Sequence, residues 1–403
     1  MKGNVFFSWV FMFSACAMIA IGRVYDDRLE LLGVNIALII SVVFFLSSAL
    51  LIVSLKRVTI TKSKFLLYIF YFLFIVLTPI LWLVYGAIEY GVLKYFNFFI
   101  VIFMSVVIIE KFNYKDVEKL LFLFLAVSSF LALLAVLGQA ISANNDSGRL
   151  SVLGGGPIIF SRWMGLGILI LVLMPKFRKY KVRYLIIVLF FILSISSGSR
   201  GPVLTLFLVL CLFLFLNFRR YFLKFIILFC FLFSLITFTD ISKEVGKLGR
   251  VERILMNFSS KGVAKKSTGT RERLIQGAVT VFKKYPLGVG SGNWQDKSNE
   301  IDTQNLMPLE YSHNIFLEVL NEYGIILALV ILMLFIYVFH LSYMLMNKYY
   351  YNESSLYTLL FYALFYFFLN SLISGDINDT RLLFVIISFI LIKTPLINKI
   401  NKC

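Results

Sequence analysis

Residues 311–324 read Tyr-Ser-His-Asn-Ile-Phe-Leu-Glu-Val-Leu-Asn-Glu-Tyr-Gly and decide how the rest of the chain is interpreted. This stretch closes the only long polar segment and opens a long apolar run. It contains His313, one of two histidines in 403 residues. It also places Glu318 and Glu322 on the first two turns of an expected membrane helix. Ionisable groups at that depth are costly and usually functional, so the stretch marks a candidate site.

The composition around this stretch is that of a membrane protein. Hydrophobic residues make up 60% of the chain and charged residues 15%, against about 45–50% and 25% in soluble domains. Apolar runs near the length of a membrane-spanning helix recur along the chain. Since lipid requires each segment to satisfy its own backbone hydrogen bonds, we predict an all-α polytopic membrane protein.

The apolar runs predict about twelve transmembrane helices. The fourth, seventh and twelfth are shorter than a typical span of about 20 residues. The predicted spans lie near 4–22, 31–54, 65–86, 95–109, 120–140, 158–174, 184–198, 202–217, 222–239, 313–340, 355–373 and 382–394.

The distribution of lysine and arginine predicts the orientation. With both termini in the cytoplasm, the cytoplasmic segments contain 20 Lys and Arg and the short outer segments contain 7. This bias follows the positive-inside rule and accounts for most of the net charge of +18. We therefore predict a multi-pass membrane protein with both termini cytoplasmic and the candidate site on the outer face.

The segment 240–312 is expected to form one large periplasmic loop. It divides the chain into helices one to nine (1–239), the loop (240–312) and helices ten to twelve (313–403). Leu274, Ala278 and Val281 recur at nearly helical spacing and predict an amphipathic helix over 271–284, which Pro286 and three glycines then end. Its apolar stripe would rest on the membrane, or it would be a plain surface helix.

Several classes of function lack their sequence signals. Two histidines and scattered cysteines do not form a zinc site, so no metal or cofactor is expected. No nucleoside triphosphate loop or nucleic-acid module is present, and no nucleic-acid partner is expected. The outer position of the polar segment also argues against a cytosolic nucleotide-sugar donor.

Arginines are placed where an anionic ligand could be held. Arg200 lies in the tight turn Ser196–Pro202 between two spans, and Arg162 lies near the start of another span. Arg271 and Arg273 flank Glu272 at the start of the loop helix. A guanidinium stays charged and donates two parallel hydrogen bonds, which suits it to phosphate, although each of these arginines could instead anchor at the interface or pair locally.

The residues around His313 provide a candidate base and polar contacts. A neutral imidazole can take a proton from an acceptor hydroxyl. Asn314, Glu318 and Glu322 lie at spacings of four and form one stripe of the helix. We expect Arg200 or Arg162 to pair with Glu318. Whether His313 or Glu318 takes the proton stays open at this point.

Three motifs together resemble the O-antigen ligase and O-antigen polymerase superfamily. His313-Asn314, followed after nine residues by Gly324, is similar to its His-Asn motif. Ser199-Arg200-Gly201 is similar to its Ser-Arg-Gly turn. Arg271, fifteen residues before Pro286-Leu-Gly-Val-Gly, is similar to its loop arginine and the motif that follows.

The resemblance implies a metal-independent, inverting transfer of a glycan from an undecaprenyl-pyrophosphate carrier. It implies catalytic roles for His313, Arg200 and Arg271, and substrate contacts for the remaining predicted residues, which are Arg273, Asn314, Glu318 and Arg162. The expected partners are the lipid-linked glycan, the bilayer and a chain-length regulator protein. A polymerase is our first expectation and a ligase acting on lipid A–core the alternative; a lipid-linked sugar flippase and a passive scaffold are less favoured.

Overall fold

The computed structural model describes residues 2–23, 29–31, 34–55, 60–137, 150, 152, 156–218, 223, 227, 261–301, 306–307, 310–349 and 355–392. Within these residues the fold is a bundle of α-helices with one short antiparallel hairpin, in which β1 (Glu30–Leu31) pairs with β2 (Val34–Asn35). The predicted all-α polytopic class is therefore confirmed, and the protein is a multi-pass membrane protein.

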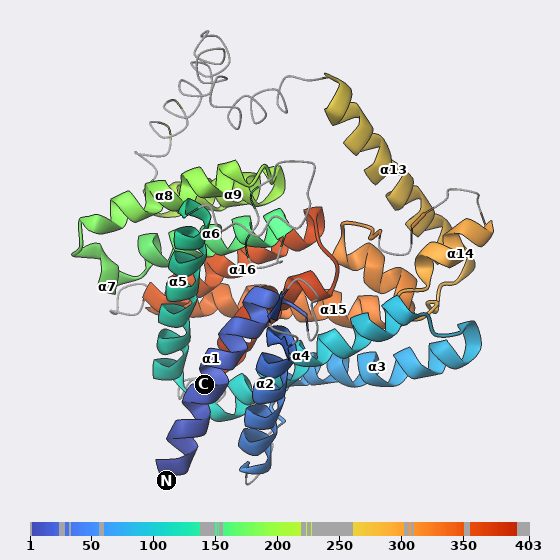
Figure 1. The fold of residues 1–403 in the computed structure, drawn as a ribbon, viewed down its shortest axis with the longest axis horizontal. Helices are drawn as coiled ribbons and strands as arrows, with labels where there is room; N and C mark the ends of the chain where they lie inside the picture. Colours follow the sequence, from blue (N-terminus) through green and yellow to red (C-terminus); the bar gives the residue numbers. More distant parts are fainter. Residues whose placement is uncertain are drawn as a thin grey trace.

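Figure 1 shows the helices packed into one bundle. The described residues contain eight helices long and apolar enough to cross a membrane, and shorter apolar helices accompany them. The bundle helices are α1 (Lys2–Ile21), α2 (Ile36–Val53), α3 (Lys62–Tyr85), α4 (Glu89–Lys111), α5 (Tyr114–Val136), α6 (Gly156–Leu173), α7 (Pro175–Arg178), α8 (Val182–Ser196), α9 (Arg200–Asn217), α15 (Ile315–Tyr349), α16 (Ser355–Ile373) and α17 (Arg381–Leu391), with the 3₁₀ turn η2 (Asn378–Thr380) before α17.

Each predicted span except 222–239 coincides with a helix, and that span lies largely outside the described residues. The fourth span was predicted to begin at residue 95, and its helix begins at Glu89. The sequence prediction treated Lys94 as a charge outside the membrane. In the structure Lys94 is buried, because carboxylates of α15 neutralise its ammonium inside the bundle.

The core of the bundle is aromatic where helices from both halves of the chain meet. Phe70 of α3 stacks on Phe384 of α17 with ring centroids 5.5 Å apart, and Phe98 of α4 packs edge-on against the same ring. Phe74 also contacts Tyr323 of α15 at 5.0 Å. These contacts fix α15 and α17 against the α3–α4 hairpin, which brings the two halves of the chain together.

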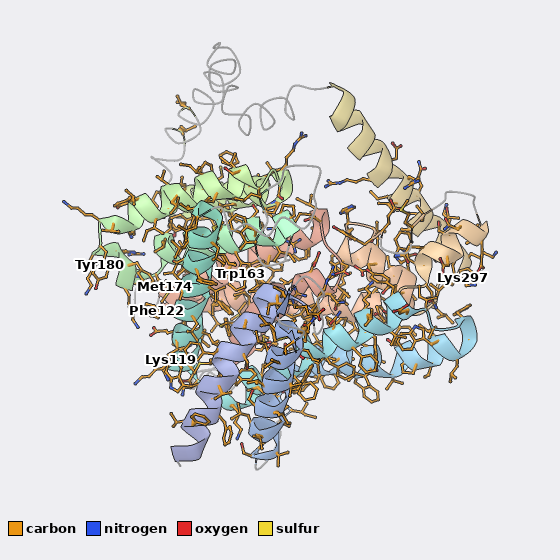
Figure 2. All side chains as sticks on the ribbon, viewed as in Figure 1. Lys119, Phe122, Trp163, Met174, Tyr180 and Lys297 are labelled. Atoms are coloured by element: carbon orange, nitrogen blue, oxygen red, sulfur yellow. The ribbon has the colours of Figure 1, made fainter. Side chains whose placement is uncertain are left out.

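The bundle has two distinct ends. At one end the α3–α4 turn contacts Asn293, and the end of α16 contacts Asn314, α6 and the start of α9; we call this the loop end. In Figure 2, Lys297 marks this side of the molecule and Tyr180 marks the opposite side. The antiparallel alternation predicted from the charges is consistent with this arrangement, while the side of the membrane that each end faces stays a prediction.

The described part of the large loop forms a small helical unit at the loop end. Helix α13 (Lys261–Lys284) leads into α14 (Trp294–Ile301), and both lie at the right-hand end of the bundle in Figure 1. Leu274, Ala278 and Val281 are buried in a small core with Trp294. The predicted apolar stripe therefore exists and packs within this unit, while the contact of α13 with the membrane surface stays a prediction.

Candidate functional site

Helix α15 is broken at Gly324, eleven residues after His313. The backbone of Gly324 has φ 78° and ψ −178°, a conformation open to glycine and costly for other residues. The break frees backbone groups that an intact helix would pair. The loop after α13 satisfies them, since Val289 N donates to Asn321 O at 3.0 Å, Gly290 N donates to Glu322 O at 2.8 Å and Ile325 N donates to Pro286 O at 2.9 Å.

Close backbone approach explains why glycines occupy both sides of this junction. A Cβ on Gly288 would lie 2.6 Å from Gly324 N, and a Cβ on Gly324 would overlap the backbone of Leu287. The short helix 315–323 is thus held between the break and the Pro286–Gly290 loop. The sequence prediction interpreted Gly288 as part of the segment that ends the loop helix. The structure shows that Gly288 and Gly324 join this loop to α15.

Glu318 and Glu322 lie on this short helix and both pair with Lys94 of α4. The Lys94 ammonium contacts Glu318 and lies 2.6 Å from Glu322 Oε1, and all three side chains are almost fully buried. The expectation that Arg200 or Arg162 pairs with Glu318 is therefore wrong. Lys94 was missed because it was counted as a loop charge, directly before the predicted start of the fourth span at residue 95.

His313 lies in the turn just before α15, with its backbone in the left-handed region at φ 57°. Among non-glycine residues this is uncommon and histidine is one of the enriched types. The imidazole is half-buried, its centroid lies 4.3 Å from that of the Tyr311 ring, and Nδ1 has no hydrogen-bond partner among the described residues. The ring is therefore packed against Tyr311, and its buried Nδ1 has an unused hydrogen-bonding capacity.

The electrostatic setting keeps His313 neutral. Burial lowers its pKa from the ordinary value of 6.5 to about 4, with a further lowering by Arg271 and a smaller opposing effect of Glu310. The imidazole is therefore unprotonated at neutral pH. The influence of Arg271 on this pKa also shows that the two predicted catalytic groups, distant in sequence, are electrostatic neighbours.

The two arginines of the loop helix differ in their surroundings. Arg273 donates from Nη2 to both carboxylate oxygens of Glu310, at 3.0 and 3.2 Å. Arg271 is exposed and pairs with no carboxylate among the residues that the structure describes. This difference favours Arg271 over Arg273 as the guanidinium that an anionic ligand would meet.

Arg162 is buried and its donors go to backbone carbonyls at the end of α16. Nη2 donates to Ser374 O at 2.6 Å and to Ser374 Oγ at 3.1 Å, while Nη1 donates to Asp379 O at 2.9 Å. Cations commonly satisfy the orphan carbonyls at a helix C-terminus in this way. The geometry gives Arg162 a role in joining α6 to the α16–α17 turn, and its predicted contact with substrate stays untested.

Arg200 is exposed on the first turn of α9, at the same end of the bundle. The following residue, Gly201, would place a Cβ 3.9 Å from Ser374 Oγ, the atom that Arg162 contacts. The predicted Ser-Arg-Gly turn thus lies beside the α16–α17 turn.

Asn314 stabilises the first turn of α15. Its Oδ1 accepts from Phe316 N at 2.9 Å and from Leu317 N at 3.3 Å, and Nδ2 donates to Leu372 O at 3.4 Å. This is an N-cap of α15 and a tie to α16. It fixes the turn that presents His313, and the predicted contact of Asn314 with substrate stays a prediction.

The α16–α17 turn adds two carboxylates that sequence reasoning missed. Asp376 accepts a long hydrogen bond of 3.4 Å from Tyr90 Oη, and burial raises the pKa of Asp379. Both acids, with Arg162 and Arg271, act on Tyr311, whose pKa is raised chiefly by burial. The predicted residues therefore gather at the loop end among charges of both signs. A turn rich in Asp, Asn and Gly offered no further signal for them.

The fold and this site define a multi-pass membrane protein with a mixed-charge site at one end of its bundle. The family described as O-antigen ligase matches residues 185–332, from α8 to the middle of α15. Over this region the chain is similar to the O-antigen ligase family, which supports a relationship to the O-antigen ligase and polymerase superfamily of membrane enzymes. A comparison with curated proteins gives no match.

Proposed function

We propose that the protein is a polymerase of O-antigen or a related surface polysaccharide. It would transfer a glycan from an undecaprenyl-pyrophosphate carrier to a hydroxyl of a second lipid-linked glycan, at the periplasmic face of the bacterial inner membrane. The observation that carries this proposal is the neutral imidazole of His313 beside the exposed guanidinium of Arg271. A base next to a phosphate-binding cation suits transfer away from a pyrophosphate leaving group.

In the proposed step, the acceptor oxygen forms a bond to the anomeric carbon as the bond from that carbon to the pyrophosphate oxygen breaks. His313 takes the acceptor proton. Arg271, together with Arg200, would stabilise the negative charge that develops on the leaving pyrophosphate. A single displacement of this kind inverts the anomeric configuration.

The depressed pKa of His313 fits this sequence of events. In the free protein the guanidinium of Arg271 opposes a second positive charge on the imidazole. A pyrophosphate bound to Arg271 would offset that charge and strengthen the imidazole as a base. Proton acceptance would thus be coupled to the presence of the donor, which limits transfer to the loaded site.

Genetic complementation tests the proposal. In a strain lacking the protein, His313→Ala, Arg271→Ala and Arg200→Ala should each fail to restore polymer while membrane levels stay normal. Loss of a general base or an oxyanion contact costs about 100- to 10,000-fold in rate. His340→Ala is the matched control, since His340 is the other histidine and lies exposed on the far part of α15. Normal chain-length ladders from His313→Ala would contradict the proposal.

The surface lipopolysaccharide of the deletion strain distinguishes polymerase from ligase. A lipid A–core carrying a single repeat unit is the result expected for a polymerase. A bare core with long lipid-linked polymer accumulating would identify a ligase instead. Loss of lipid-linked glycan from the periplasmic face would point to the flippase alternative.

A further inference from the structure

We infer that Lys94 is a positioning residue for glycan transfer, which holds the short helix 315–323 against α4 and so fixes His313 relative to Arg271. The inference deepens the proposed function and rests on it. Lys94 is buried and touches Glu318 and Glu322, so it acts on the reaction through these carboxylates.

His313 and Arg271 are carried by segments that meet at one junction. His313 precedes the short helix, and Arg271 lies on α13, whose C-terminal loop enters the break at Gly324. Three backbone hydrogen bonds join that loop to the short helix and to Ile325. A shift of the short helix would therefore strain or break these hydrogen bonds, and the relative position of His313 and Arg271 would no longer be fixed.

Helix α4 contacts this junction from the other side. Gly292 packs on the start of α4, where a Cβ would lie 2.6 Å from Gly91 Cα. Trp82 Nε1 donates to Ser291 O at 3.3 Å, and Asn293 Nδ2 donates to Gly86 O at 2.7 Å. The loop is thus wedged between the α3–α4 hairpin and the broken helix.

One carboxylate connects α4, the loop after α13 and the short helix 315–323. Glu322 Oε1 accepts from Gly292 N at 3.1 Å and from the Lys94 ammonium at 2.6 Å. Glu318, one turn away, shares the same ammonium. Without that ammonium, two carboxylates four residues apart would repel one another in a site that excludes water. The short helix would then be displaced from α4.

The test measures geometry and transfer on the same variants of the full chain. Spin labels on cysteines at the exposed position Val279 of α13 and the half-buried position Leu320 of the short helix, in a background without the native cysteines, report the distance across the junction in lipid nanodiscs. Complementation of the deletion strain reports transfer. The variants are Lys94→Met, Lys94→Arg and the exchange Lys94→Glu with Glu322→Lys, which keeps one ammonium for two carboxylates.

We expect Lys94→Met to broaden the distance distribution and to lower transfer by about 100-fold, the scale associated with misplacing reacting groups by about 1 Å. Lys94→Arg and the exchange should restore a narrow distribution and much of the transfer. The inference fails if Lys94→Met keeps normal transfer or a narrow distribution. It also fails if the exchange restores a narrow distribution without transfer, because positioning is the only role assigned to Lys94.

Lys64→Met provides the matched control. Lys64 is equally buried on α3 and pairs with Glu110 of α4 at 2.7 Å. Its loss should leave the distance distribution narrow, since neither partner touches the loop or α15 in the described contacts. The distance measurement also separates this inference from the proposed function. A broadened junction in Lys94→Met, together with normal polymer from His313→Ala, would leave the positioning intact and remove the proposed chemistry.

Discussion

Two buried lysine–glutamate pairs lie at opposite ends of α4 and show that the same kind of interaction can have different roles. Lys64 of α3 meets Glu110 of α4 as one ammonium for one carboxylate, and Tyr68 Oη donates to the same Glu110 oxygen at 2.6 Å. Lys94 is one ammonium for two carboxylates of α15. About 24 Å of α4 separates the two sites, at about 1.5 Å of rise per residue.

The difference lies in what each pair connects. Lys64 and Glu110 are 46 residues apart and close a helical hairpin whose members follow one another in the chain. Lys94 and Glu322 are 228 residues apart and join the first half of the chain to the helix that follows His313. A buried ion pair is weak evidence for stability by itself. Its partners therefore decide whether it belongs to the fold or to the site.

The largest expected effect comes from breaking the loop-end junction without removing a charge. Gly324→Ala should destabilise the protein by more than the roughly 1–3 kcal/mol that a strained backbone costs, because the new Cβ also meets the Leu287 backbone. Denaturant unfolding in detergent measures this, alongside transfer in cells.

Gly86→Ala is its matched control. Gly86 has φ 86° and ψ 161°, close to the values of Gly324, and a Cβ there would meet nothing within 4 Å. It should show the backbone cost alone and retain transfer. Equal losses for the two variants would show that the contact with Leu287 contributes nothing.

An effect of intermediate size is expected for the protonation of His313 at the loop end. Because its pKa is lowered to about 4, the imidazole should stay neutral from pH 7 down to about pH 5 and gain its proton only below that. The folded protein binds fewer protons than the unfolded chain between about pH 6.5 and 4, so this group costs stability as pH falls through that window. NMR of labelled histidine in nanodiscs measures the titration, with His340→Gln for assignment.

Substitutions of the neighbours test the cause of that shift. Arg271→Gln should raise the pKa of His313, and Glu310→Gln should lower it further. Lys64→Met, at the other end of α4, should leave the titration unchanged. An ordinary titration near pH 6.5 in the unmodified protein would contradict the burial of the ring.

The smallest effect is expected for Arg273. Its pair with Glu310 is partly exposed, with 39% and 23% of the two side chains accessible, and such pairs contribute about 0.2–1 kcal/mol. Arg273→Ala should therefore reduce transfer by only a few-fold, whereas Arg271→Ala should abolish it. A loss for Arg273→Ala as large as that for Arg271→Ala, measured by chain-length ladders at matched membrane levels, would reverse the assignment.

Much of the site was accessible from local sequence. His313 and Asn314 interrupt the approach to an apolar run, and Arg271 and Arg273 begin an amphipathic stretch. Such signals depend only on neighbours in the chain. The pairing of Glu318 was predicted wrongly, because arginines near span ends were considered as partners while Lys94 was assigned to a loop. No local pattern distinguishes a lysine in solvent from one neutralised by a helix more than two hundred residues away.

The sequence alone determined that the chain is a multi-pass helical membrane protein, because apolar runs of spanning length have no other stable form in lipid. It also determined that His313, Arg162 and Arg200 lie near the ends of apolar runs. Only the tertiary structure decided that Gly324 breaks α15, that the Pro286–Gly290 loop fills the break, and that Lys94 is shared by Glu318 and Glu322. These features depend on backbone approach and charge burial between distant segments, which appear only when the helices are packed.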